Sequence, residues 1–128
     1  MFKTAHQLVL EAKTQITESN PAGVIERLKT ANTLLLDVRE PEEYTAGHLS
    51  GAINIPRGML EFKISADPAL QDLARPIILY CKTSGRAALA ALSLKSMGFS
   101  NVVSLAGGYD GWVEAGHPVS KPSSVSFE

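Results

Sequence analysis

Three short runs of apolar residues stand out along the chain, at residues 33–37, 76–80 and 101–105. They are continuous rather than alternating, which is typical of strands buried on both faces of a parallel sheet. A fourth run, at residues 52–55, ends at a proline, and the stretch around Ile16 predicts a weaker fifth strand. The hydrophobic pattern therefore predicts a mostly parallel central sheet of about five strands.

Helical patterns lie between these runs. Residues 21–29 follow a favourable N-cap at Asn20, and residues 86–97 are rich in helix formers and are followed by a glycine. Residues 2–13 predict a third, peripheral helix, and residues 40–44 open a short acidic one. Because strands and helices alternate, the sequence predicts an α/β fold in which helices flank the sheet.

The length of 128 residues fits one ordinary domain. We predict an N-terminal helical extension at residues 1–14, the domain itself at 15–119 and a loose tail at 120–128. No run approaches the roughly 18 apolar residues of a membrane span, and the N-terminal stretch is too polar for a signal peptide. We therefore expect a cytoplasmic protein.

Composition excludes several classes of function. A formal net charge of −1 creates no overall field that would recruit nucleic acid or a membrane surface, so neither partner is expected. One cysteine cannot form an internal disulfide, and His6, His48 and His117 are too scattered to complete a structural zinc site with it. We expect no metal and no cofactor, and any anion must be bound locally.

The stretch CKTSGR at residues 81–86 is the candidate anion-binding loop. A buried strand ends just before it, and ligand sites in open α/β sheets gather at the carboxyl ends of the strands. The helix that follows supplies unpaired backbone N–H groups and the positive end of its dipole. Small residues let successive N–H groups surround one anion, and two cations add positive charge. The candidate binding residues of this loop are Lys82, Thr83, Ser84, Gly85 and Arg86.

Cys81, the single cysteine, is the candidate nucleophile of this loop. Helix N-termini and adjacent cations favour the thiolate, which is the reactive form, over the thiol. A lone cysteine at the end of a strand can equally be a small buried hydrophobic residue. The residue pattern by itself leaves both interpretations open.

Three motifs resemble the signatures of the rhodanese family. Residues 36–40 (LDVRE) and 43–56 (EYTAGHLSGAINIP) resemble its N-terminal signature. Residues 81–86 resemble its active-site loop, and residues 105–112 (LAGGYDGW) resemble its closing signature. The motifs occur in the family order, and the resemblance spans about residues 15–117. It implies a rhodanese-like three-layer domain with a central parallel sheet.

The resemblance also implies a thiosulfate:cyanide-type sulfurtransferase. The thiolate of Cys81 would attack the sulfane sulfur of thiosulfate or a persulfide donor and become a persulfide. That persulfide would pass its terminal sulfur to cyanide in an assay, or to a thiol or protein acceptor in the cell. The loop N–H groups would hold the anionic persulfide, while Lys82 and Arg86 would attract the donor, a small sulfur-containing anion.

Other polar residues of the motifs favour structural roles. Asp37 and Arg39 are expected to pair with each other or to support the loop, because charges near a core need partners. His48 is a candidate general base, but a stabilised thiolate needs none, so packing or a hydrogen bond is favoured. Arg57 is either a solvated charge or a cation at the rim of the site, facing the donor.

Two other functions compete with sulfur transfer. One is a non-catalytic rhodanese-like module that binds a protein partner, although such modules often lack the cysteine. The other is a related phosphatase or arsenate reductase. Cell-cycle dual-specificity phosphatases have one more residue between cysteine and arginine than the four that separate Cys81 from Arg86, and they carry histidine in place of Tyr80. The shorter loop suits one sulfur atom better than a tetrahedral phosphate.

Overall fold

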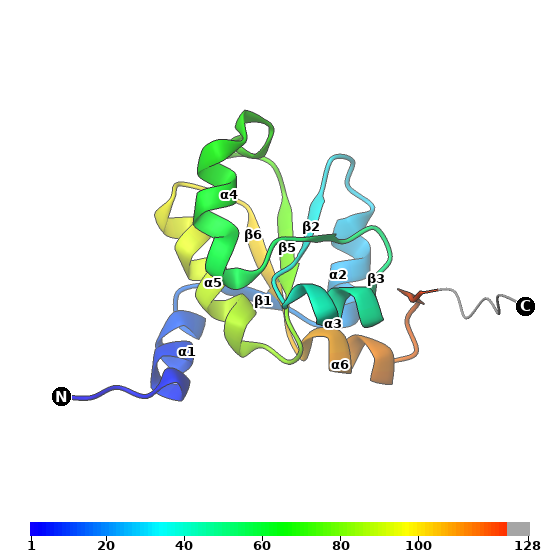
Figure 1. The fold of residues 1–128 in the computed structure, drawn as a ribbon, viewed down its shortest axis with the longest axis horizontal. Coiled ribbons are helices and arrows are strands. Elements are labelled where there is room, and N and C mark those ends of the chain that lie inside the picture. Colours follow the sequence, from blue (N-terminus) through cyan, green and yellow to red (C-terminus); the bar gives the residue numbers. More distant parts are fainter. Residues whose placement is uncertain (123–128) are drawn as a thin grey trace, which may run out of the picture.

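The fold is a five-stranded parallel sheet with helices on both faces (Figure 1). The computed structural model describes residues 1–122. The strand order is β1-β6-β5-β2-β4, so β5 lies in the middle. The strands are β1 (Thr17–Ser19), β2 (Leu34–Asp37), β4 (Ile53–Asn54), β5 (Ile77–Tyr80) and β6 (Val102–Leu105). The predicted fold class, with a parallel sheet of five strands, is confirmed.

Helices form the outer two layers. Helices α4 and α5 cover one face of the sheet, α2 and α6 cover the other, and α1 packs on α5 (Figure 1). None of the helices in the described part of the chain is long and apolar enough to cross a membrane. The helices are α1 (Ala5–Lys13), α2 (Pro21–Leu28), α3 (Pro41–Ala46), α4 (Leu60–Ala66), α5 (Gly85–Ser96) and α6 (Gly108–Glu114), with 3-10 turns η1 (Arg57–Met59) and η2 (Pro68–Leu70).

Successive side chains of the central strands fill two separate cores. Leu36 of β2 packs in the cluster beneath α4 and α5, whereas Leu35 packs in the cluster beneath α2 and α6. Because the side chains of a strand alternate between faces, Tyr80 and Cys81 also point to opposite sides. Burial on both faces is the physical reason why these strands are continuous apolar runs in the sequence.

The sequence did not predict α4, α6 or a small antiparallel pair formed by β3 (His48–Leu49) and β7 (Val119–Ser120). Helix α6 contains two glycines, which lower intrinsic helix propensity, so its formation depends on tertiary contacts. Ser120 pairs with His48, so its assignment to a loose tail was wrong. Residues 123–128 of the predicted tail lie outside the described residues.

The start of α6 lies directly against the predicted active-site loop. The backbone N–H groups of Tyr109 and Asp110 donate to the carbonyls of Cys81 and Lys82 at 2.8 and 3.0 Å. Gly108 has a φ of +58°, and a Cβ there would lie 2.5 Å from the Cys81 carbonyl oxygen. Only glycine allows this approach of two backbones. Gly108 therefore allows the start of α6 to support the loop.

Replacing Gly108 should be far more costly than replacing another glycine with positive φ. Gly116 has a φ of +82° but nothing within 4 Å, so Gly116→Ala measures the backbone penalty alone. We expect Gly116→Ala to lower the free energy of unfolding by about 1–2 kcal/mol. Gly108→Ala adds a clash with the loop backbone and should cost about 3 kcal/mol or more. Urea denaturation measures both, and equal losses would contradict the proposed support.

Candidate active site

Cys81 directly follows the middle strand of the sheet, at its carboxyl edge, and its side chain is 1% exposed. The backbone N–H of Ala87 donates to its Sγ atom at 3.3 Å. Ala87 is the third residue of α5, so this N–H is one of the helix donors that has no carbonyl partner within the helix. A backbone donor at this position stabilises negative charge on the sulfur.

Both cations of the predicted loop have carboxylate partners. Lys82 Nζ lies 2.8 Å from Asp110 Oδ2, and Arg86 donates to both carboxylate oxygens of Glu43 at 2.7 and 3.0 Å. The hydrogen bonds from Arg86 lower the pKa of Glu43 from 4.5 to about 2. The same contact raises the pKa of Arg86. The bidentate pair is therefore ionised throughout the neutral and mildly acidic range.

Sequence reasoning missed Glu43 and Asp110 as site residues. The sequence predicts residues 40–44 as the acidic start of a helix, and neither this prediction nor the family signature assigns Glu43 a role in the site. A usable signal was present, because both carboxylates lie in the two motifs that flank the loop motif and the loop contains two cations. Cations beside a core require counter-charges, which those motifs supply.

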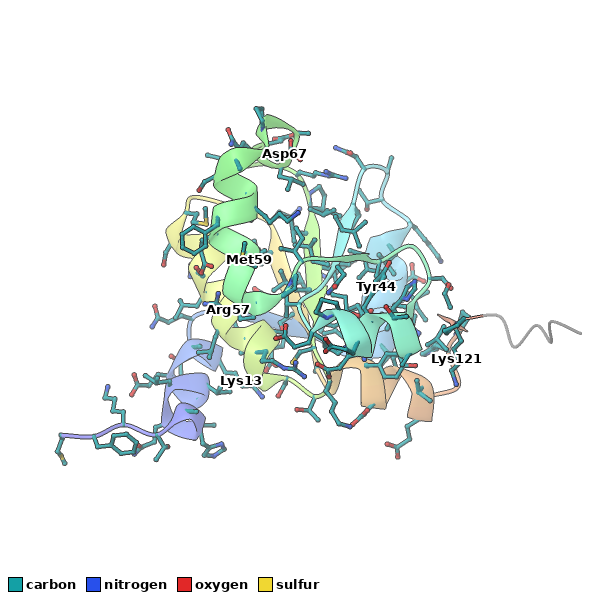
Figure 2. The ribbon with its side chains drawn as sticks, viewed as in Figure 1. Lys13, Tyr44, Arg57, Met59, Asp67 and Lys121 are labelled. Atoms are coloured by element: carbon teal, nitrogen blue, oxygen red, sulfur yellow. The ribbon has the colours of Figure 1, made fainter. Side chains whose placement is uncertain are left out.

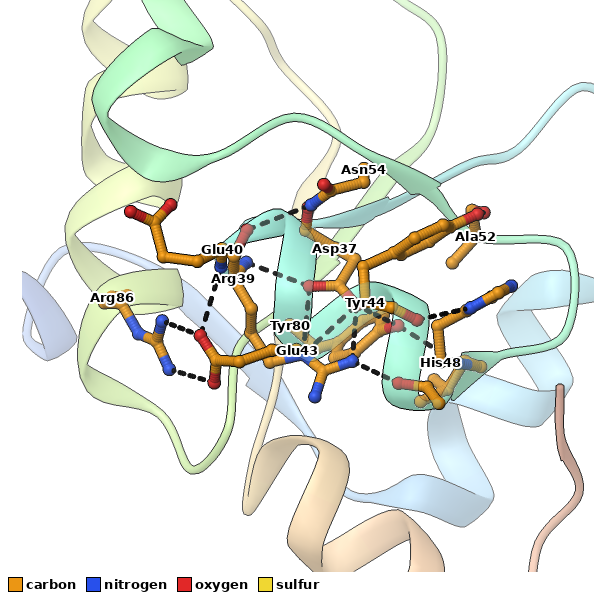
Figure 3. A network of polar contacts seen from close by, with 12 residues as sticks. Asp37, Arg39, Glu40, Glu43, Tyr44, His48, Ala52, Asn54, Tyr80 and Arg86 are labelled. Carbon is orange, nitrogen blue, oxygen red and sulfur yellow. Dashed lines mark hydrogen bonds and ion pairs between the residues drawn. The ribbon is translucent and has the colours of Figure 1, made fainter. Parts of the chain in front are cut away.

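A buried polar network lies on the other side of β5 (Figure 3). Asp37 is fully buried and Arg39 is 4% exposed. The Arg39 guanidinium donates to the Asp37 carboxylate at 2.7–3.1 Å. The Tyr80 hydroxyl donates to Asp37 Oδ2 at 2.7 Å and accepts from the backbone N–H of Leu49 at 3.0 Å. Asp37 and Arg39 thus pair with each other, and Tyr80, the residue before Cys81, joins this pair to the end of β5.

The charges of this network are mutually stabilised. Burial, together with the contact to Asp37, raises the pKa of Tyr80 well above its usual value, so the hydroxyl keeps its proton. Burial alone would lower the pKa of Arg39, but the hydrogen bonds and charge of Asp37 outweigh it and the pKa is raised. Arg39 also donates to the Gly47 carbonyl at 2.6 Å and lies over the Tyr109 ring at 4.4 Å. It therefore connects β2 with the start of β3 and with α6.

An open hollow of about 270 Å³ lies beside the loop. Two cations and two carboxylates line it, together with an aromatic ring, and they come from all three sequence motifs. This mixed charge can receive a small polar molecule beside Lys82, whereas the buried Cys81 is not among the lining residues. The lining residues are Arg39, Glu43, Ala46, Gly47, Lys82, Tyr109 and Asp110.

His48 and Arg57 are engaged elsewhere. His48 Nδ1 donates to the Tyr44 carbonyl at 2.9 Å, and its ring stacks on the Tyr44 ring at 3.8 Å, which fits the favoured packing role (Figure 3). Arg57 (Figure 2) pairs with Glu61 at 2.8 Å and does not line the hollow. Within residues 1–122, no three His, Cys, Asp or Glu side chains are grouped to hold a metal ion.

Comparison with known proteins identifies the family. The model of the rhodanese-like domain matches residues 20–115. The chloroplastic thiosulfate sulfurtransferase 16 of Arabidopsis thaliana is 33% identical, over 83% of this chain and 95% of its own length. Among the first curated relatives, this chain covers 65% of the full length of one protein and 97% of the full length of another.

Solved structures agree with this match. A protein of unknown function from Rhodopseudomonas palustris CGA009, described as a possible tyrosine phosphatase, has a TM-score of 0.84 and 29% identity, with 94% of this chain and 96% of that one covered. The polysulfide-sulfur transferase homodimer of Wolinella succinogenes has a TM-score of 0.77 and 31% identity, with 91% and 87% covered. The family match over most of the chain, the shared fold and sulfurtransferase-named relatives together show that this chain belongs to the rhodanese-like family and support sulfurtransferase activity in general.

Proposed function

We propose that this protein is a thiosulfate:cyanide-type sulfurtransferase that carries sulfur as a persulfide of Cys81. The observation that carries the proposal is the backbone N–H of Ala87 at 3.3 Å from the Cys81 sulfur, at the carboxyl end of β5. The thiolate attacks the sulfane sulfur of thiosulfate, a new S–S bond forms, and sulfite leaves with the electrons of the broken S–S bond. Cyanide or an acceptor thiolate then attacks the terminal sulfur and regenerates the Cys81 thiolate.

The two cations of the loop have different parts in this reaction. The Lys82–Asp110 pair is half-exposed on both sides, so it is weak and can exchange Asp110 for an incoming anion. Arg86 is held by two hydrogen bonds to Glu43 and keeps its place at the start of α5. Lys82 therefore receives the donor in the hollow, while Arg86 fixes the loop.

A lone cysteine suits a carrier that works where thiols are kept reduced. With no second cysteine in the chain, the persulfide has no internal thiol with which to form a disulfide. The sulfur therefore waits for an external acceptor, which we propose is a small thiol or a protein thiol in the cytoplasm.

Intact-mass measurement after thiosulfate treatment tests the nucleophile directly. The wild-type protein should gain the mass of one sulfur atom, keep it through desalting and lose it on addition of cyanide or thiol. Cys81→Ser should gain nothing and transfer no sulfur, although its unfolding midpoint stays close to that of the wild type. Sulfur transfer by this variant at the wild-type rate would end the proposal, and spontaneous loss of the sulfur without an acceptor would exclude a carrier role.

Removing the two carboxylates one at a time should separate the roles of the cations. Asp110→Asn frees Lys82 and should lower KM for thiosulfate with little change in kcat. Glu43→Gln loosens Arg86 and should lower kcat and reduce the free energy of unfolding by about 0.5–1 kcal/mol at pH 7. Because the pKa of Glu43 is depressed, this stabilisation exists above pH 4.5 and is lost as pH falls toward 2.

Steady-state kinetics and urea denaturation at several pH values measure these effects. The stability difference between the wild type and Glu43→Gln should shrink steadily below pH 4.5. Identical kinetic changes in Asp110→Asn and Glu43→Gln would contradict the division of roles between Lys82 and Arg86.

Loop length should select sulfur transfer over phosphate chemistry. Four residues separate Cys81 from Arg86, whereas an oxyanion with four oxygens needs a wider ring of donors. The native protein should show negligible phosphatase activity. One glycine inserted between Ser84 and Gly85 should sharply reduce sulfur transfer and improve phosphate binding, because attack requires near-attack distances of about 3–3.5 Å. Undiminished sulfur transfer by the longer loop would show that ring size is not the selector.

A further inference from the structure

Helix α5 begins without the usual side-chain cap. Ser84 is its N-cap residue, but with φ −156° and ψ −16° it makes no side-chain cap hydrogen bond. Thr4 and Asn20, the N-caps of α1 and α2, are extended and accept the backbone N–H of the third helical residue. At α5 the equivalent N–H belongs to Ala87, and it donates to the Cys81 sulfur instead. The sulfur therefore uses the donor that a capping serine ordinarily takes.

Lys13 holds the Ser84 side chain away from that donor. Its Nζ donates to Ser84 Oγ at 2.8 Å, across 71 positions of sequence. Lys13 is the last residue of α1, which packs on α5 and lies beside the loop in Figure 2. An ammonium group only donates, so it occupies a lone pair of the hydroxyl oxygen and keeps that oxygen turned toward α1. This charge-assisted bond stabilises the conformation in which Ser84 does not cap.

We propose that Lys13 is a positioning residue of the active-site loop, which holds Ser84 in its non-capping conformation and so leaves the Ala87 N–H to the Cys81 sulfur. Without Lys13, Ser84 is free to become extended and to compete for the same N–H. Lys13 lies before residues 20–115, so it is outside the part of the chain that the family model matches. The consequence for sulfur transfer rests on the proposed function, whereas the effect on the reactivity of Cys81 does not.

A double-mutant cycle in the full chain separates this mechanism from a direct effect of charge. The variants are Lys13→Met, Ser84→Ala and the two combined, with Lys13→Arg as the conservative replacement. Lys3→Met is the matched control, because Lys3 pairs with Glu11 on the exposed side of α1. The readout is the rate of alkylation of Cys81 by iodoacetamide against pH, which requires no sulfur transfer.

We expect Lys13→Met to slow the alkylation of Cys81 at pH 7 about threefold, because the sulfur then competes with Ser84 for the Ala87 N–H. Lys13→Arg should restore most of the reactivity, and Lys3→Met should behave as the wild type. In the Ser84→Ala background, Lys13→Met should leave the alkylation rate unchanged, since alanine cannot cap the helix. This non-additivity is the signature of an effect that acts through Ser84.

Two results would overturn the inference. One is an unchanged alkylation profile in Lys13→Met. The other is an equal slowing by Lys13→Met with and without Ser84, because that would assign the effect to charge alone. Sulfur transfer measured on the same variants should follow their alkylation rates. If the cycle behaves as expected but the wild-type protein transfers no sulfur, the inference on Lys13 stands and the proposed function fails.

Discussion

The buried ion pair between Asp37 and Arg39 determines the geometry of this site. Removing two charges from water is costly, so such a pair persists only when further hydrogen bonds satisfy it. Here Asp37 accepts hydrogen bonds from the Tyr80 hydroxyl and from the backbone N–H of Arg39, and the Arg39 guanidinium donates to the Gly47 carbonyl. Because these partners come from β5, from the segment after β2 and from the residue before β3, the pair fixes the end of the middle strand. Cys81 begins the loop from that fixed point.

A second set of charges acts at the surface of the loop. The Arg86–Glu43 pair joins α5 to α3, and the Lys82–Asp110 pair joins the loop to α6. The loop is therefore held from both sides. They also cancel most of the positive charge that the motif CKTSGR indicates by itself. Under the proposed function, attraction of an anionic donor depends on exchanging a carboxylate partner, and the more exposed pair makes this exchange easier. The backbone N–H groups, which have no counter-charge, provide the remaining attraction.

The parts of the structure that the sequence predicted are those that follow from local rules. The runs at 33–37, 76–80 and 101–105 contain β2, β5 and β6, because strands buried on both faces need apolar residues at every position. The fold class, the capped helices and the loop after β5 followed from the same reasoning. Helix α6 did not, since its first residue, Gly108, is required by backbone contact with a loop about 25 residues earlier. The partners of Arg86 and Lys82 are 43 and 28 residues away, so no local pattern reveals them, and the only signal was their place in the two flanking motifs.

The reactivity of the sulfur depends on how a small number of backbone donors is distributed. A helix start has only its first few N–H groups free, and every group used for capping is lost to a ligand. In α1 and α2 a side-chain oxygen takes the third N–H, whereas in α5 the sulfur takes it. The N-cap residue of α5 is a serine, and serine is a favourable capping residue. Its hydroxyl oxygen therefore competes with the Cys81 sulfur for the Ala87 N–H. The contact from Lys13 removes that competitor, so a helix outside the matched family domain takes part in defining the electrostatic environment of Cys81.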